Sequence, residues 1–117
     1  MSIRIVVADD HPVIREGLRA LIETQPNMEL VGEAGDGRTA VELAETLRPD
    51  VMVLDISMPD LNGIEAARQV LARCPQVKVI ALSMHRDLAS ISKMLEAGAS
   101  AYMLKTSGFA EIAHAIE

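Results

Sequence analysis

The stretch Val51-Met-Val-Leu-Asp55 decides the fold, because four consecutive apolar residues lead directly into a carboxylate. Three other runs have the same form: an apolar, strand-like segment ends on a polar side chain. The side chains that end these runs are Asp9 with Asp10 after 3–8, Ser83 after 77–82 and Lys105 after 101–104. Parallel strands bring their carboxyl ends to one edge of an open α/β sheet, where such folds place their ligands. We therefore expect three carboxylates, a hydroxyl and an ammonium to converge on one site.

The chain repeats a strand-then-helix unit five times. Strand-like runs begin near residues 3, 28, 51, 77 and 100, and segments with helical periodicity lie between them. Pro12 suits the first turn of a helix, Asn62-Gly63 indicates a turn before the third helix, and Gly98 indicates a helix end. This pattern predicts an alternating α/β architecture.

The composition of the strand-like runs predicts their places in the sheet. The runs at 3–8, 51–54 and 77–82 are almost wholly apolar, as is typical of strands covered on both faces. The run at 28–34 contains Glu29 and Glu33, which favours an edge position.

Size and charge exclude several classes of protein. The chain has 117 residues, enough for one domain with a single core, and a formal net charge of -6. An acidic segment is poorly suited to hold nucleic acid by itself, since phosphates are met with Lys and Arg. No apolar stretch approaches the roughly 20 residues of a membrane helix, and the start does not read as a signal peptide. The lone Cys74 excludes an intramolecular disulfide, so we expect a cytoplasmic protein.

The strings at the strand ends resemble a known family. They are Val7-Ala-Asp9-Asp10-His-Pro12, Leu54-Asp55-Ile-Ser-Met-Pro59-Asp-Leu-Asn-Gly63, Leu82-Ser83 and Ala97-Gly98-Ala-Ser-Ala-Tyr102-Met-Leu-Lys105. In this order they resemble the receiver (CheY-like) domains of two-component response regulators, and most closely the NarL/FixJ subfamily. The resemblance implies a flavodoxin-like (βα)5 fold over residues 1–117, with a five-stranded parallel sheet in the order 2-1-3-4-5 and helices on both faces.

The resemblance also implies a role for each polar strand end. Asp55 corresponds to the phosphoacceptor, and a carboxylate can act as a nucleophile that forms an aspartyl phosphate. By the same analogy Asp10 and Asp55 bind Mg²⁺ directly, Asp9 acts through water, and the backbone carbonyl of Ser57 completes the protein ligands. Oxygen-only ligation of this kind is what Mg²⁺ prefers.

The remaining positions match the groups that respond to phosphorylation. Lys105 and Ser83 match the ammonium and hydroxyl that bind the phosphoryl group, and Tyr102 matches the aromatic switch position. His85, two residues past Ser83, is a candidate for the rim of the pocket. Thr106 follows Lys105 where many receivers have proline, so we expect a trans peptide bond there.

The resemblance implies partners outside this chain. A cognate sensor histidine kinase would donate the phosphoryl group, and the domain would act as a switch and not as a turnover enzyme. The helix after Ser107-Gly108 is still periodic at Glu117, so we expect a helix-turn-helix output domain that is absent from this chain. DNA binding would then belong to the full-length protein, with a homodimer formed on phosphorylation, and no membrane is involved.

Other functions remain open at this point. The chain could be an unphosphorylated receiver-like interaction module, although its carboxylate set is intact. A phosphohydrolase that forms an aspartyl phosphate would place its nucleophile on the first strand, whereas Asp55 follows the third. A flavin-binding domain would need a phosphate-binding loop after the first strand, where Asp9 and Asp10 would repel the phosphate.

Several residues also have ordinary structural interpretations. Asp10 precedes His11-Pro12 and could cap the first helix. His11 stands beside the carboxylates and could act with them, but its position favours a plain loop histidine. Cys74 is interpreted as a structural residue. The arginines at positions 15, 19 and 48 read as parts of solvated helix faces.

Overall fold

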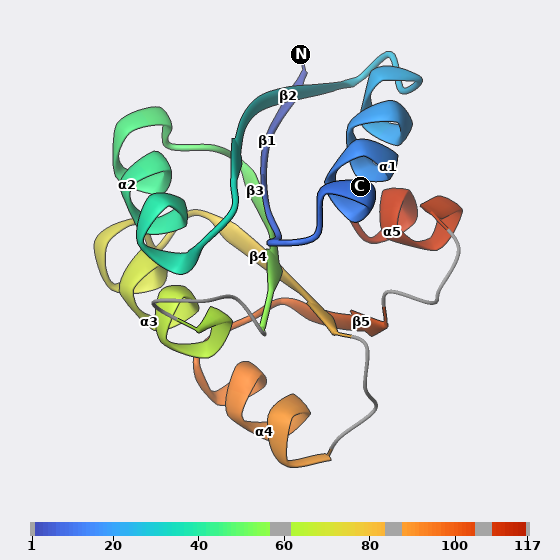
Figure 1. Ribbon diagram of the computed structural model, residues 1–117. Helices are drawn as coiled ribbons and strands as arrows, with labels where there is room; N and C mark the ends of the chain where they lie inside the picture. The colour runs from blue at the N-terminus through green and yellow to red at the C-terminus, as the bar shows by residue number, and fades with distance from the viewer. Residues whose placement is uncertain (1, 57–61, 84–87, 105–108, 117) are drawn as a thin grey trace.

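The computed structural model describes residues 2–56, 62–83, 88–104 and 109–116. Within these residues, five strands alternate with five helices (Figure 1). The elements are β1 Ile3–Ala8, α1 Pro12–Glu23, β2 Met28–Ala34, α2 Gly37–Leu47, β3 Val51–Asp55, α3 Gly63–Arg73, β4 Lys78–Ser83, α4 Leu88–Glu96, β5 Ala101–Leu104 and α5 Phe109–Ile116.

The five strands form one parallel sheet in the order β2-β1-β3-β4-β5. This order confirms the sheet implied by the sequence, with the Glu-containing strand β2 at an edge. The central strand β3 pairs with β1 through Leu54 and Ala8, and with β4 through Asp55 and Leu82. The register therefore brings the ends of β1, β3 and β4 to the same edge.

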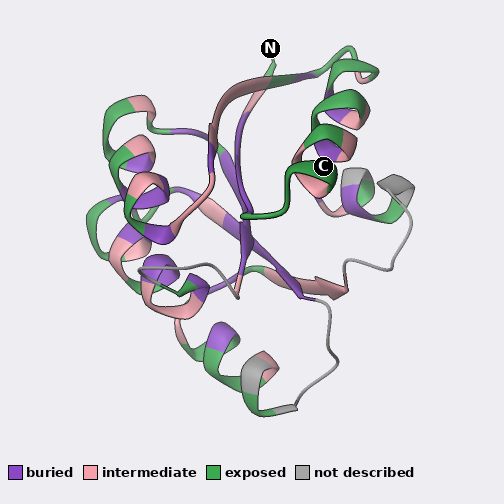
Figure 2. Cartoon of the chain, viewed as in Figure 1, coloured by how far each residue is buried: buried purple, intermediate pink, exposed green. Residues whose placement is uncertain are grey.

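Helices cover both faces of the sheet and leave two apolar layers between helices and strands. Figure 1 shows α1 and α5 on one face and α2 and α3 on the other. Leu18 and Ile22 of α1 pack with Ile112 and Ile116 of α5 in one layer. The other layer holds small residues of α2 and α3 together with Met94 of α4. Figure 2 shows the central strands buried and the outer helix faces exposed, as expected for strands that are apolar on both sides.

Helix boundaries follow from local side chains. Asp36 caps α2, because its carboxylate accepts the backbone N–H of Thr39 at 2.8 Å. This hydrogen bond lowers the pKa of Asp36 below its ordinary value of 3.8, because it favours the charged form. Gly98 follows α4 with a φ of 107°, which confirms the predicted helix end and requires glycine's freedom in the left-handed region.

One helix start differs from the sequence interpretation. Pro12 begins α1 as predicted, but the residue at the cap position is His11 and not Asp10. No cap hydrogen bond is made by the side chain of His11. The carboxylate of Asp10 instead lies 3.2 Å from the imidazole of His11, so it contacts this side chain and does not cap the helix.

None of the helices in the described part of the chain combines the length and the apolar character needed to cross a membrane.

Candidate functional site

Three strands deliver polar side chains to the carboxyl edge of the sheet. Asp9 follows β1, Asp55 ends β3 and Ser83 ends β4. Their exposed fractions are 0%, 1% and 2%, and they are the buried polar or charged residues of the described chain. Polar groups are seldom buried without a chemical reason, because removing them from water costs free energy. The strand register places the ends of β1, β3 and β4 side by side at this edge.

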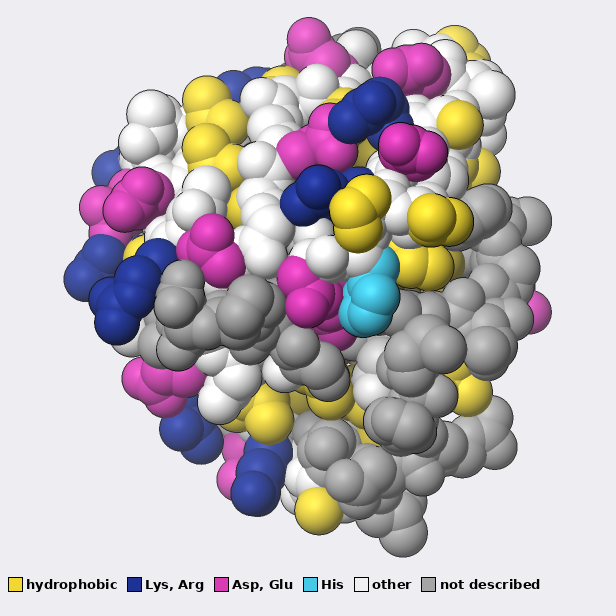
Figure 3. Space-filling view, viewed as in Figure 1, with side chains coloured by type: hydrophobic (Ala, Val, Ile, Leu, Met, Phe, Trp, Pro, Cys, Tyr) yellow, Lys and Arg dark blue, Asp and Glu magenta, His cyan; other side chains and the backbone are white. Residues whose placement is uncertain are grey.

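Asp10 and His11 complete an acidic cluster with Asp9 and Asp55. One ligand atom from each of the four residues lies within 4.8 Å of the others. The imidazole Nδ1 of His11 lies 2.9 Å from Asp9 Oδ1, 3.2 Å from Asp10 Oδ1 and 3.8 Å from Asp55 Oδ2. Figure 3 shows a histidine beside exposed acidic side chains on this face of the molecule. The expected neighbourhood of His11 and the carboxylates is therefore confirmed, and the preferred interpretation of His11 as a plain loop residue is not.

The loop between β1 and α1 is folded around the Asp9 carboxylate. The Oδ1 atom of Asp9 accepts the backbone N–H of His11 at 2.7 Å, and the Asp9 N–H donates to the carbonyl of Ala34 at 2.9 Å. These bonds hold the carboxylate at the end of the strand, buried and pointing toward the cluster. Asp10, beside it, remains partly exposed and can reach a ligand from solvent.

The donor set fits a small hard cation. Carboxylates this close repel one another, and burial of two of them strengthens the repulsion. Magnesium takes oxygen ligands at about 2.1 Å, so two oxygens on opposite sides of the ion stand about 4.2 Å apart. The ligand atoms of the cluster, one from each of its four residues, all lie within 4.8 Å of one another, so one ion of this size could contact several of them. The acidic cluster is therefore suited to a small divalent cation such as Mg²⁺.

Gly63 braces the end of β3, a role that sequence reasoning missed. A Cβ added to Gly63 would lie 2.2 Å from the carbonyl oxygen of Asp55 and 2.4 Å from the Cα of Ile56. The Gly63 N–H donates to the carbonyl of Ile56 at 3.2 Å, and Asn62 caps α3 by accepting the N–H of Glu65. The Asn62-Gly63 pair was predicted as a turn, and it is also the contact that fixes the strand end bearing Asp55. A glycine at the start of a helix does not by itself indicate which backbone it contacts.

The other predicted site residues fall into two groups. Ser83 is buried at the end of β4, and Tyr102 is half-buried in β5 against the core layer that contains α3 and α4. Ser83 pairs in register with Leu104, the last residue of β5. Ser57, His85 and Lys105 lie outside the described residues.

Cys74 and Arg15 were both predicted to have no part in the site, and the structure confirms this prediction for Cys74 alone. Cys74 is buried, and its thiol donates to the carbonyl of Ala44 at 3.6 Å, which confirms a structural role. Arg15 is only 27% exposed and donates to the carbonyl of Asp9, so its interpretation as part of a solvated face is wrong.

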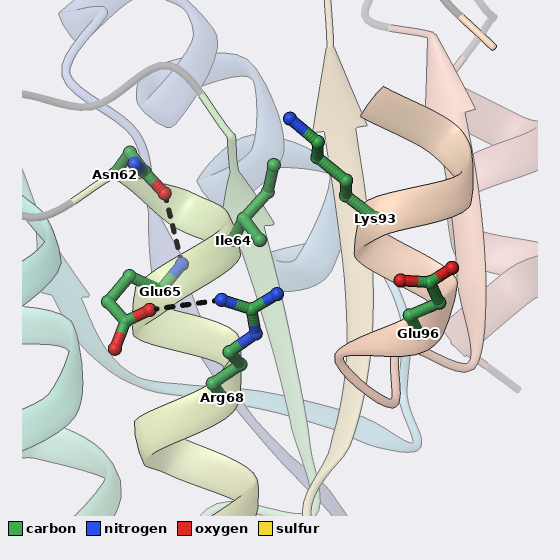
Figure 4. Close-up of a pocket in the computed structure, with 6 residues that line it drawn as sticks. All are labelled: Asn62, Ile64, Glu65, Arg68, Lys93 and Glu96. Carbon is green, nitrogen blue, oxygen red and sulfur yellow. Dashed lines mark hydrogen bonds and ion pairs between the residues drawn. The ribbon is translucent and has the colours of Figure 1, made fainter. Parts of the chain in front are cut away.

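A separate hollow lies between α3 and α4, away from the acidic cluster (Figure 4). It is lined by Asn62, Ile64, Glu65, Arg68, Lys93 and Glu96. Its two carboxylates and two cations balance, and Arg68 pairs with Glu65 within the same helix. Mixed charge of this kind is typical of a solvated helix surface.

Comparison with known proteins identifies the family to which the sequence belongs. Residues 5–117 match the profile of the response regulator receiver domain. The transcriptional regulatory protein DegU of Brevibacillus brevis is 45% identical over 104 residues, which are 89% of this chain and 44% of DegU. LiaR of Bacillus subtilis is 45% identical over 97% of this chain and 54% of LiaR. The chain thus spans about half the length of the curated relatives that it matches.

A solved structure agrees with these relatives. The signal receiver domain of NarL from Mycobacterium tuberculosis superposes with a TM-score of 0.94 at 36% identity. The superposition covers 98% of this chain and 93% of that domain.

Proposed function

Because the chain belongs to the response regulator receiver domain family, we propose that it is a switch controlled by phosphorylation of Asp55. Domains of this family are signalling switches of two-component systems. The observation that carries the proposal is the cluster of three carboxylates at the carboxyl edge of the sheet, two of them buried. Carboxylates crowded in this way repel one another, and a cation bound among them would compensate their charge.

Asp55 is the residue of this cluster best placed to accept a phosphoryl group. It ends the central strand of the sheet, and Gly63 holds its backbone in place. Its carboxylate oxygen would attack the phosphorus of a phosphohistidine on a sensor histidine kinase. The new O–P bond forms as the P–N bond breaks, and the imidazole of the kinase leaves with the electron pair. The product is an aspartyl phosphate and an unmodified kinase.

Asp10 and Asp55 would hold Mg²⁺ directly, with Asp9 acting through water and the carbonyl of Ser57 as a further ligand. When bound, the cation would neutralise charge on the transferring phosphoryl group, which otherwise meets an acidic pocket. His11, now within 3.8 Å of all three carboxylates, would have to yield part of that space.

Ser83 and Lys105 would report the phosphoryl group to the rest of the domain. A ligand shifts a conformational equilibrium only through contacts that differ between the two states. The Ser83 hydroxyl and the Lys105 ammonium would make such contacts with phosphoryl oxygens, and Tyr102 on the neighbouring strand would repack. The surface formed by α4, β5 and α5 would change as a result.

The output of the switch would be transcription. DegU and LiaR are transcriptional regulators about twice as long as the part this chain matches. We expect this domain to control a helix-turn-helix segment in a cytoplasmic protein, with a homodimer formed on phosphorylation so that two half-sites are read. The net charge of -6 makes DNA binding by this domain itself unfavourable.

Intact-mass measurement tests the proposal against its alternatives. The protein is incubated with acetyl phosphate in the presence of Mg²⁺ or of EDTA. We expect the mass of one phosphoryl group to be added only with Mg²⁺, and not to be added to Asp55→Asn. A mass that never changes would indicate an unphosphorylated interaction module. Continuous release of phosphate from simple phosphomonoesters would indicate a phosphohydrolase.

A further inference from the structure

We propose that Arg15 is a positioning residue that sets the orientation of the Asp9–Asp10 peptide group and thereby the affinity of the acidic cluster for Mg²⁺. The inference rests on the proposed function, because it concerns the same cluster. The proposed role belongs to a residue of α1, whereas the site residues described so far lie at or next to strand ends.

The contact that carries the inference joins a helix to the loop bearing the metal ligands. One terminal nitrogen of the Arg15 guanidinium, Nη1, donates to the backbone carbonyl of Asp9 at 3.1 Å. This carbonyl belongs to the same planar peptide group as the N–H of Asp10. Its direction therefore determines where the chain continues into Asp10 and where the Asp10 carboxylate lies.

Arg15 is itself held in place from the edge of the sheet. Its Nε lies 3.9 Å from a carboxylate oxygen of Glu33 in β2. The other oxygen of Glu33 accepts two hydrogen bonds from Arg19, at 2.9 and 2.6 Å. Arg15 and Glu33 are 27% and 25% exposed, so the contact is partly shielded from water. A guanidinium with one carboxylate partner and one carbonyl partner has few alternative orientations.

The backbone beside Arg15 leaves room for this arrangement. A Cβ added to Gly35 would lie 2.8 Å from Nη1 of Arg15, closer than real Cβ contacts occur. Gly35 directly follows Ala34, whose carbonyl accepts the N–H of Asp9 at 2.9 Å. The backbone of Asp9 is thus held on both sides: Ala34 of β2 accepts its N–H, and Arg15 of α1, which lies beside Glu33 and Gly35, donates to its carbonyl.

Positioning and simple electrostatics predict opposite effects on metal binding. Arg15 is a cation near the cluster, so removing its charge should strengthen binding of Mg²⁺ if charge alone matters. If Arg15 orients the ligands, removing it should weaken binding, because groups that orient metal ligands commonly contribute tenfold or more to affinity. Whether the affinity for Mg²⁺ falls or rises when Arg15 is replaced therefore distinguishes a positioning role from a purely electrostatic effect.

The experiment compares Arg15→Met with Arg19→Met. Both variants lose one charge from the same helix and one partner of Glu33, and methionine keeps an apolar stem. Mg²⁺ is titrated while the amide spectrum is recorded, with no phosphoryl donor present. We expect Arg15→Met to bind Mg²⁺ about tenfold more weakly and to shift the Asp10 amide before Mg²⁺ is added. Arg19→Met should bind within about twofold of the parent and leave that amide in place.

Thermal unfolding without Mg²⁺ identifies the folded variants, and Arg15→Gln replaces Arg15→Met if the latter is unfolded. Equal or tighter binding by the folded position-15 variant would overturn the positioning role. Weakening of the same size in Arg19→Met would overturn it as well. Absence of Mg²⁺ binding by the parent protein would instead contradict the proposed function.

Discussion

The α-carbon of Gly63 lies against the main chain of Asp55, so closely that a Cβ at position 63 would stand 2.2 Å from the Asp55 carbonyl oxygen. The first residue of α3 thus supports the end of β3 at the residue that we propose as phosphoacceptor. A nucleophile must be held in position to react efficiently, since a small misplacement raises the barrier. The contact links helix packing directly to the chemistry of the site.

Replacement of Gly63 by alanine should therefore destabilise the protein. Alanine in a helix is ordinarily favoured over glycine by about 1 kcal/mol. Here the clash involves backbone atoms that must move, so we expect a net loss of about 1–3 kcal/mol in the free energy of unfolding. Urea unfolding of Gly63→Ala and of the parent measures this loss. Phosphorylation by acetyl phosphate should also be slower in Gly63→Ala than in the parent. A gain in stability would contradict the close contact.

Magnesium should stabilise the fold through Asp10. At a concentration ten times the dissociation constant, a bound ligand adds about 1.4 kcal/mol to the free energy of unfolding. We expect thermal unfolding to shift upward with Mg²⁺ in the parent and much less in Asp10→Asn. Glu29→Gln removes an exposed charge of β2, distant in sequence from the cluster, and should keep the full shift. An equal shift in Asp10→Asn would exclude Asp10 as a ligand.

Acid should weaken the cap of α2. The Thr39 N–H lowers the pKa of Asp36 in the folded state below 3.8, so the unfolded chain binds the proton more readily. The stability that the charged cap contributes is complete above pH 3.8 and is lost as the pH falls through the folded value. Asn is also a good cap but does not titrate. The parent should therefore lose stability relative to Asp36→Asn as the pH falls below 3.8; a difference in unfolding free energy that stays constant with pH would contradict the assignment.

A phosphoryl mimic should change the structure beyond the metal ligands. Amide spectra recorded with and without beryllofluoride should show changes that spread from Asp55 to Ser83 and along β5 to Tyr102. The strands carry the change directly, because Asp55 pairs with Leu82 and Ser83 pairs with Leu104. Asp55→Asn should show none of these changes. Changes confined to Asp9, Asp10 and Asp55 would rule out the switch.

Much of this architecture could be predicted from the sequence, because strand ends in a parallel sheet obey a simple rule. Apolar runs that stop on Asp9, Asp55 and Ser83 identify both the strands and the edge where they meet. The bounds of β2 and β5 follow from the runs within a residue, and the charges of β2 indicate its edge position.

The contacts that support the site could not be predicted in this way. Arg15 has the spacing of a solvated helix residue, and only the structure shows that its side chain turns back to the carbonyl of Asp9. The sequence places His11 next to the carboxylates, but only the structure shows that the turn around Asp9 brings its ring within 2.9 Å of the Asp9 carboxylate. Gly63 is required by a backbone eight residues earlier in the chain. Each of these depends on tertiary packing, which neither periodicity nor residue type encodes.

The central claim is that the phosphoryl group is attached to Asp55, and chemical trapping tests it most directly. Borohydride reduces an acyl phosphate to an alcohol, so a phosphorylated aspartate becomes homoserine. The protein is treated with acetyl phosphate and Mg²⁺, reduced, digested and sequenced by mass spectrometry. We expect homoserine at position 55 alone, and none in protein that received no phosphoryl donor. Homoserine at position 9 or 10, with Asp55 unchanged, would contradict the account.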